Sequence, residues 1–92
     1  KLYPSDKDRR CRLQYLRNFY LSGENDKLGE IIAYLEDEDY TIRISAVNTF
    51  SEILNKENKE VLLSVVRKRL KTENSRAVKA SIEQLLSYAE GI

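Results

Sequence analysis

Few residues in this chain could perform chemistry, and the usual catalytic combinations are missing. The 92 residues include no histidine, so no imidazole can act as a general base near neutral pH or as a metal ligand. The single cysteine, Cys11, cannot form an internal disulfide, and no histidine or second cysteine activates it. We expect Cys11 to pack in the apolar stripe of a helix. The composition therefore predicts a protein that is not an enzyme and has no metal or cofactor.

One acidic stretch has the spacing of a metal site. Asp37, Asp39 and Thr41 alternate like the first ligands of a calcium-binding loop. Such a loop needs glycine at its sixth position and glutamate at its twelfth, where this sequence has Ile42 and Asn48. We therefore interpret the stretch as a turn that leads into a helix.

Basic residues form two clusters that could contact the phosphates of a nucleic acid. The residues available for this role are Arg9, Arg10, Arg17, Arg67, Lys68 and Lys71. The formal net charge is only +1, however, from 16 basic and 15 acidic residues, so no overall field favours nucleic acid or a membrane surface. No apolar run approaches the roughly 18 residues of a membrane helix. Nucleic-acid binding is therefore the alternative function and not the first one.

Apolar residues recur at helical spacing along most of the chain. Between residues 37 and 54 they fall on one arc when plotted at 100° per residue, as on an amphipathic helix. The same pattern predicts five helices, over about 5–21, 25–36, 40–55, 59–71 and 76–90. Ser5 and Asn25 are suitable N-caps, and Gly23 is a favourable residue after the end of the first helix. The sequence therefore predicts an all-α fold.

A basic residue interrupts the apolar arc of the central helix. Arg43 needs an acidic partner there, and Asp37, six residues earlier, is placed to supply one. Shifts of 31 and 36 residues align this pair with similar pairs before and after it, although a shift of 35 fits the last helix about equally well. The expected acid–base pairs are Asp6–Arg12, Asp37–Arg43 and Glu73–Lys79. Helix pairs repeated over 31–36 residues indicate a stacked α-solenoid.

The acid–x₅–base spacing followed by Ile42-Arg-Ile-Ser-Ala-Val47 resembles the HEAT repeat. The resemblance covers one domain within 1–92, with a half repeat at 5–22 and full repeats at 25–55 and 58–90. It implies a right-handed superhelical α-solenoid of about two and a half helix pairs, with an acid–base ladder along the stack. An armadillo-like or other helix-pair repeat is the alternative. Because the chain begins with Lys, we expect it to be a fragment of a longer protein.

The resemblance also implies a function and a binding surface. Such modules are non-catalytic scaffolds that hold a protein or peptide partner in a larger assembly, here in the cytoplasm or nucleus. The second helix of each repeat lines the concave face. The positions opposite the apolar stripes are Gln14, Arg17, Asn18, Ser45, Asn48, Glu52, Glu83 and Gln84. This mixed polar surface fits a protein or peptide better than a duplex.

The first helix is apolar around most of its circumference. Its predicted stripe is Cys11, Tyr15, Leu16 and Phe19, with Arg12 inside the arc. Since no earlier helix covers it, we expect part of its apolar flank to be exposed and available for self-association. The flanking residues are Leu13, Tyr20 and Leu21.

Overall fold

The computed structural model describes residues 6–92, and helices are the only regular secondary structure in that range. The α-helices are α1 (Asp6–Leu21), α2 (Leu28–Ala33), α3 (Tyr40–Ile53), α4 (Lys59–Leu70) and α5 (Arg76–Ala89). Two 3₁₀ turns, η1 (Asn25–Lys27) and η2 (Tyr34–Glu36), extend α2 at both ends. The predicted all-α fold with five helices is therefore confirmed, with bounds close to those expected.

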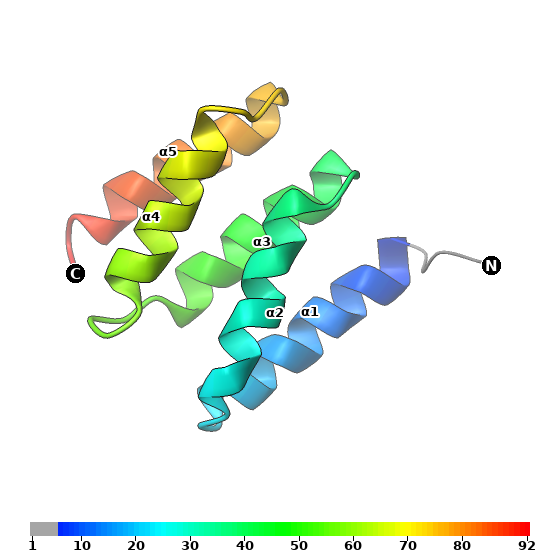
Figure 1. Ribbon diagram of the computed structural model, residues 1–92, viewed down its shortest axis with the longest axis vertical. Helices are drawn as coiled ribbons and strands as arrows, with labels where there is room; N and C mark the ends of the chain where they lie inside the picture. The colour runs from blue at the N-terminus through cyan, green and yellow to red at the C-terminus, as the bar shows by residue number, and fades with distance from the viewer. Residues whose placement is uncertain (1–5) are drawn as a thin grey trace.

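The helices form two layers (Figure 1). One layer contains α1, α3 and α5, which lie side by side and run in the same direction, and α3 packs against both of its neighbours. The other layer contains α2 and α4, which cross in front and run back in the opposite direction. The backbone measures 42 × 33 × 15 Å, so the two layers form a thin slab. The pair α2/α3 is followed by the pair α4/α5, and α1 occupies one end.

The apolar core follows α3. Its predicted arc is confirmed, because Ile42, Ala46, Val47, Phe50 and Ile53 are at most 2% exposed. The core extends from this arc into every other α-helix. The further buried apolar residues are Leu13, Leu16, Ile31, Leu35, Leu62, Leu63, Val66, Val78, Ile82, Leu85 and Ala89. One continuous core therefore joins the two layers and both helix pairs.

Gly23 ends α1 as predicted. Its φ of +115° lies in a region that residues with a Cβ rarely adopt. The Gly23 N–H donates to the Tyr20 carbonyl at 3.1 Å, and the Glu24 N–H donates to the Phe19 carbonyl at 3.0 Å. These two bonds form a Schellman motif, which satisfies the last carbonyl groups of the helix.

Side chains cap the N-termini of α3 and α5. Asp39 begins α3, where its carboxylate accepts from the Thr41 N–H at 2.8 Å, and Ser75 begins α5 in the same way. The predicted cap at Asn25 is wrong: the helical segment starts with Asn25 itself as a 3₁₀ turn, and no side chain caps it. The predicted cap at Ser5 lies outside the described residues.

The apolar stripe predicted for α1 is wrong except for Leu16. Cys11 is exposed, and Tyr15 and Phe19 are 61% and 40% exposed, with their rings stacked 5.9 Å apart. Leu13 and Leu16 form the buried stripe instead. Because α1 is apolar on several sides, its pattern fits more than one stripe, and only the side that meets α2 and α3 is covered.

The expectation that part of the apolar flank of α1 is exposed is confirmed for two of its three residues. Leu21 is 58% exposed, as expected, whereas Leu13 is buried and Tyr20 is half-buried. The main exposed apolar surface of α1 is therefore the stacked pair Tyr15 and Phe19, which the sequence prediction had assigned to the core.

The buried residues of α1, α3 and α5 align at shifts that differ in part from the predicted ones. Leu13 and Leu16 align with the buried Val47 and Phe50 at a shift of 34 residues, three more than predicted. A shift of 35 then aligns that α3 pair with Ile82 and Leu85 on α5. Because three residues are almost one helical turn, shifts of 31 and 34 align similar helix faces, and apolar pattern alone separates them poorly.

Asn58 ties the turn between α3 and α4 to α1. It is 4% exposed, and its Nδ2 donates to the Tyr20 hydroxyl and to the Ile53 carbonyl, both at 2.9 Å. Its Oδ1 accepts from the Asn55 N–H at 2.8 Å. Every polar group of this buried amide therefore has a partner.

We predict that Asn58→Ala lowers the free energy of unfolding by about 2 kcal/mol, because buried backbone and hydroxyl groups lose their partners. Urea unfolding followed by circular dichroism measures this loss. Asn25→Ala is the control, since Asn25 is exposed and its side chain makes no hydrogen bond within residues 6–92. Equal midpoints for the two variants would contradict the role given to Asn58.

Candidate partner-binding groove

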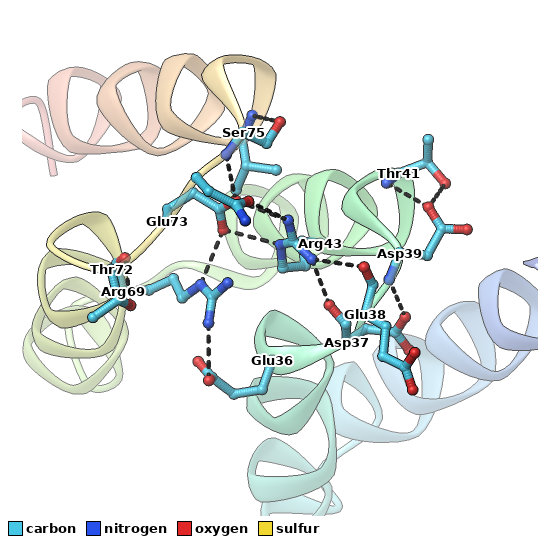
Figure 2. A network of polar contacts seen from close by, with 12 residues as sticks. Glu36, Asp37, Glu38, Asp39, Thr41, Arg43, Arg69, Thr72, Glu73 and Ser75 are labelled. Atoms are coloured by element: carbon cyan, nitrogen blue, oxygen red, sulfur yellow. Dashed lines mark hydrogen bonds and ion pairs between the residues drawn. The ribbon is translucent and has the colours of Figure 1, made fainter.

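A buried ion pair joins the two helix pairs (Figure 2). Arg43 on α3 is 5% exposed, and its Nε and Nη2 donate to the two carboxylate oxygens of Glu73, each at 2.9 Å. Glu73 lies in the turn between α4 and α5, and its side chain is fully buried. The paired donors of arginine match the two oxygens of a carboxylate, so this contact fixes orientation as well as distance.

The pairing of Arg43 differs from the predicted Asp37–Arg43 ion pair. Arg43 contacts Asp37 only through the backbone: its Nη1 donates to the carbonyls of Asp37 at 2.6 Å and Glu38 at 3.1 Å. The Asp37 carboxylate accepts from the Asp39 N–H at 2.9 Å and lies 3.4 Å from Arg9 of α1. Arg9 and Arg43 therefore each contact an acid of the following helix pair.

The outer members of the predicted ladder also differ. Arg12 is exposed and bonds to Glu30 at 2.9 Å, and Lys79 is exposed without an ion pair among residues 6–92. The side chain of Asp6 lies outside the described part of the chain. At the shift of 34 residues, which aligns the buried residues of α1 and α3, Arg9 and not Arg12 corresponds to Arg43.

Glu73 has further partners that the sequence prediction missed. Its carboxylate also accepts from Arg69 Nε and from the Ser75 N–H, both at 2.9 Å. Arg69 in turn donates to Glu36 at 3.0 Å (Figure 2). Burial alone would raise the pKa of Glu73, but the hydrogen bonds from Arg43, Ser75 and Arg69 outweigh it and lower that pKa to about 2. The spacing of four residues between Arg69 and Glu73 could have identified this pair from the sequence, because such residues are neighbours on a helix surface.

Two hollows lie over α1, α3 and α5, and no residue of α2 or α4 lines them. The first, of about 190 Å³, is lined by Arg10, Leu13, Gln14, Arg17, Ser45, Asn48, Thr49 and Glu52. The second, of about 510 Å³, is lined by Asn48, Ser51, Glu52, Ser81, Gln84, Leu85 and Tyr88. Asn48 and Glu52 border both hollows, so together they form one groove across the three helices.

Most predicted partner-binding residues lie in this groove. The lining residues among them are Gln14, Arg17, Ser45, Asn48, Glu52 and Gln84. Asn18 and Glu83 are exposed but lie outside the lining, and Asn18 accepts a hydrogen bond from Arg17 at 3.2 Å. The lining residues that the prediction did not include are Leu13, Thr49, Ser51, Ser81, Leu85, Arg10 and Tyr88. Of these, Arg10 and Tyr88 have exposed side chains that a partner could contact. Both lie one turn from a predicted groove residue, and that spacing could have identified them.

The groove contains side-chain amides that are free to bind. The side chains of Gln14, Asn48 and Gln84 make no hydrogen bonds within residues 7–92. The hydroxyls of Ser45 and Thr49, by contrast, donate to backbone carbonyls four residues earlier, at 3.1 and 2.8 Å. Each helix of the groove therefore contributes one amide that can both donate and accept a hydrogen bond.

One ion pair crosses the groove. Arg17 Nη1 on α1 bonds to Glu52 Oε1 on α3 at 3.1 Å. The Nε of Arg17 is buried without a hydrogen-bond partner, and the Glu52 side chain is 53% exposed. The Glu52 carboxylate therefore keeps acceptor capacity, and the pair is a partly solvated one that contributes little to stability.

The basic residues considered for nucleic-acid contacts do not form one surface. Arg9 faces Asp37 and Asp39, at 3.4 and 3.6 Å, and Arg10 and Arg17 line the groove. The other three basic residues lie in or just after the last turn of α4, which belongs to the other layer and is on the far side of α2 from α1 (Figure 1). These exposed residues, which have no ion pair in the described chain, are Arg67, Lys68 and Lys71.

Within residues 6–92, no three histidine, cysteine, aspartate or glutamate side chains come together in a way that could hold a metal ion. No helix in that range is long and apolar enough to cross a membrane. Comparisons with protein-family models, with curated proteins and with solved structures find no match to this chain.

We predict that acid destabilises the fold through Glu73. Its pKa of about 2 lies below the ordinary value of 4.5, so its contribution is complete above about pH 4.5 and is lost as the pH falls toward 2. The expected loss is on the order of 3 kcal/mol. Urea unfolding at several pH values between 2 and 6 measures it.

Glu73→Gln is the matched variant, because it keeps the shape of the side chain but cannot titrate. It should be less stable than the wild type at pH 6 and should lose less stability on acidification. If both proteins lose the same free energy between pH 5 and 2, the acid transition belongs to other carboxylates.

Proposed function

We propose that this chain is a HEAT-like α-solenoid module that acts as a non-catalytic scaffold and binds a protein partner through an extended segment of that partner. The repeated order of layers supports the solenoid, since α2/α3 and α4/α5 follow one another in the same arrangement (Figure 1). Two contacts support it too. Arg9–Asp37 joins α1 to the pair α2/α3, and Arg43–Glu73 joins that pair to α4/α5. Stacked helix pairs present one helix of each pair to a common surface.

The free amides of the groove are the observation that favours an extended peptide. A side-chain amide can donate to a backbone carbonyl and accept from a backbone N–H at the same time. An extended segment has such groups unpaired, and recognition of its backbone gives affinity without requiring one sequence. Gln14, Asn48 and Gln84 supply these amides from three successive helices of one layer.

The composition of the groove supports a scaffold more than an enzyme. Among residues 7–92, its lining contains no cysteine, histidine or lysine, and the one carboxylate there, that of Glu52, is paired with Arg17. A nucleophile with an adjacent base, or a pair of carboxylates, is what acyl or glycosyl transfer would need. We place the scaffold in the cytoplasm or nucleus, because the exposed thiol of Cys11 suits a reducing compartment.

Protein binding is favoured over nucleic-acid binding by the distribution of charge. Arg9 and Arg17 already face carboxylates, so their charges are partly neutralised. The free basic residues of α4 lie in the other layer, away from the groove. Nucleic acid would therefore meet two separate basic sites, with acidic side chains beside the first of them.

A display selection tests this function. Random 12-residue peptides on phage are selected against the immobilised domain, and retained peptides are titrated against Asn48→Ala and Gln84→Ala. Each substitution removes one or two hydrogen bonds and should weaken binding about five- to tenfold. The control is Asn25→Ala, which removes an exposed amide outside the groove and should leave affinity unchanged.

Peptides that bind all variants equally would move the site away from the groove. Failure to retain any peptide, together with a steeply salt-dependent shift of DNA or RNA oligonucleotides on a gel, would favour the nucleic-acid alternative.

A further inference from the structure

The two ends of the groove differ in chemistry. The hollow at the α1 end contains Arg10 and Arg17, which are seven residues apart and therefore lie on the same face of α1. Of the residues in the range 7–92 that line the hollow at the α5 end, none is basic, and Tyr88 contributes an exposed aromatic ring there. The groove is therefore basic at one end and apolar at the other.

Arg10 is the second cation at the basic end. Within residues 7–92 its one hydrogen bond runs from Nη2 to the neutral Thr41 hydroxyl at 3.3 Å, and no carboxylate of those residues pairs with it. Arg17 shares Glu52, and its Nε has no acceptor. Among residues 7–92, the side chains that line this hollow include two guanidinium groups and one carboxylate, and the excess positive charge favours an anionic side chain.

Tyr88 forms the apolar end. Its side chain is 55% exposed, and beside it Leu85 is 1% exposed. Gln84 and Ser81, which line the same hollow, are neutral. A large aliphatic or aromatic side chain placed against Tyr88 would bury apolar surface on both partners.

We propose that the groove selects extended peptides with an acidic residue at the Arg10 end and a large apolar residue at the Tyr88 end. This inference rests on the proposed function, that the groove binds an extended peptide. Neighbouring helices pack roughly 8–10 Å apart and an extended chain advances about 3.3 Å per residue. Because α3 lies between α1 and α5, the two ends lie two helix spacings apart, and Arg10 is near the start of α1 whereas Tyr88 is in the last turn of α5. The acidic and apolar residues of the peptide should therefore be about five to seven positions apart.

Labelled host peptides test this selection. Twelve-residue peptides of glycine, serine, threonine and alanine carry one aspartate and one leucine at separations of one to nine positions, and binding is measured by fluorescence anisotropy. Peptides with a separation of five to seven should bind about tenfold tighter than the same peptides with asparagine for aspartate, or with serine for leucine. Raising the salt from 50 to 200 mM should weaken the aspartate peptides more than the asparagine peptides.

Variants of the protein assign each preference to its residue. Arg10→Gln should reduce the preference for aspartate to less than twofold and leave the preference for leucine intact. Tyr88→Ser should do the reverse. Arg67→Gln and Tyr40→Ser are matched controls, because they change exposed residues of the same types outside the groove and should preserve both preferences.

The outcomes separate this inference from the proposed function. If host peptides bind with an affinity that Asn48→Ala weakens, but aspartate and asparagine bind equally or Arg10→Gln keeps the preference, the selection is wrong and the groove stays a peptide site. If no host peptide binds in a way that depends on Asn48, the proposed function fails, and this inference with it. The salt comparison on the wild-type protein tests the contribution of charge without any variant.

Discussion

The arrangement of this fold depends on the buried ion pair between Arg43 and Glu73. Burying two charges is unfavourable unless their hydrogen-bonding groups are satisfied, and here they are. Apolar helix faces tolerate small sliding movements, whereas the two parallel bonds between a guanidinium and a carboxylate do not. Because Arg43 belongs to α3 and Glu73 to the turn before α5, the pair sets the position of one helix pair on the next.

The groove follows from that position. The apolar sides of α3 and α5 turn toward the core and the other layer, so their polar sides remain together on the surface. The amides of Asn48 and Gln84 then border the same hollow without internal partners. The contact of Arg43 at one end of α3 therefore helps to determine which side chains line the groove along the rest of that helix.

The sequence predicted the helices, and most of the residues it assigned to the polar face line the groove, because the apolar arc of α3 is unambiguous and the opposite face follows from it. It identified Arg43 as unusual but assigned the wrong partner: Asp37 is near in sequence, whereas Glu73 is brought near only by packing. The α1 stripe failed because that helix is apolar on several sides. Arg10 and Tyr88 were missed because their exposure depends on which sides of α1 and α5 are covered.

A double-mutant cycle tests the central claim most directly. The free energies of unfolding of Arg43→Met, Glu73→Gln and the double variant are compared with that of the wild type at neutral pH. If the ion pair aligns the helix pairs, the double variant should be less destabilised than the sum of the single variants, with a coupling energy of at least about 1.5 kcal/mol. Additive effects, with a coupling below about 0.5 kcal/mol, would contradict the account.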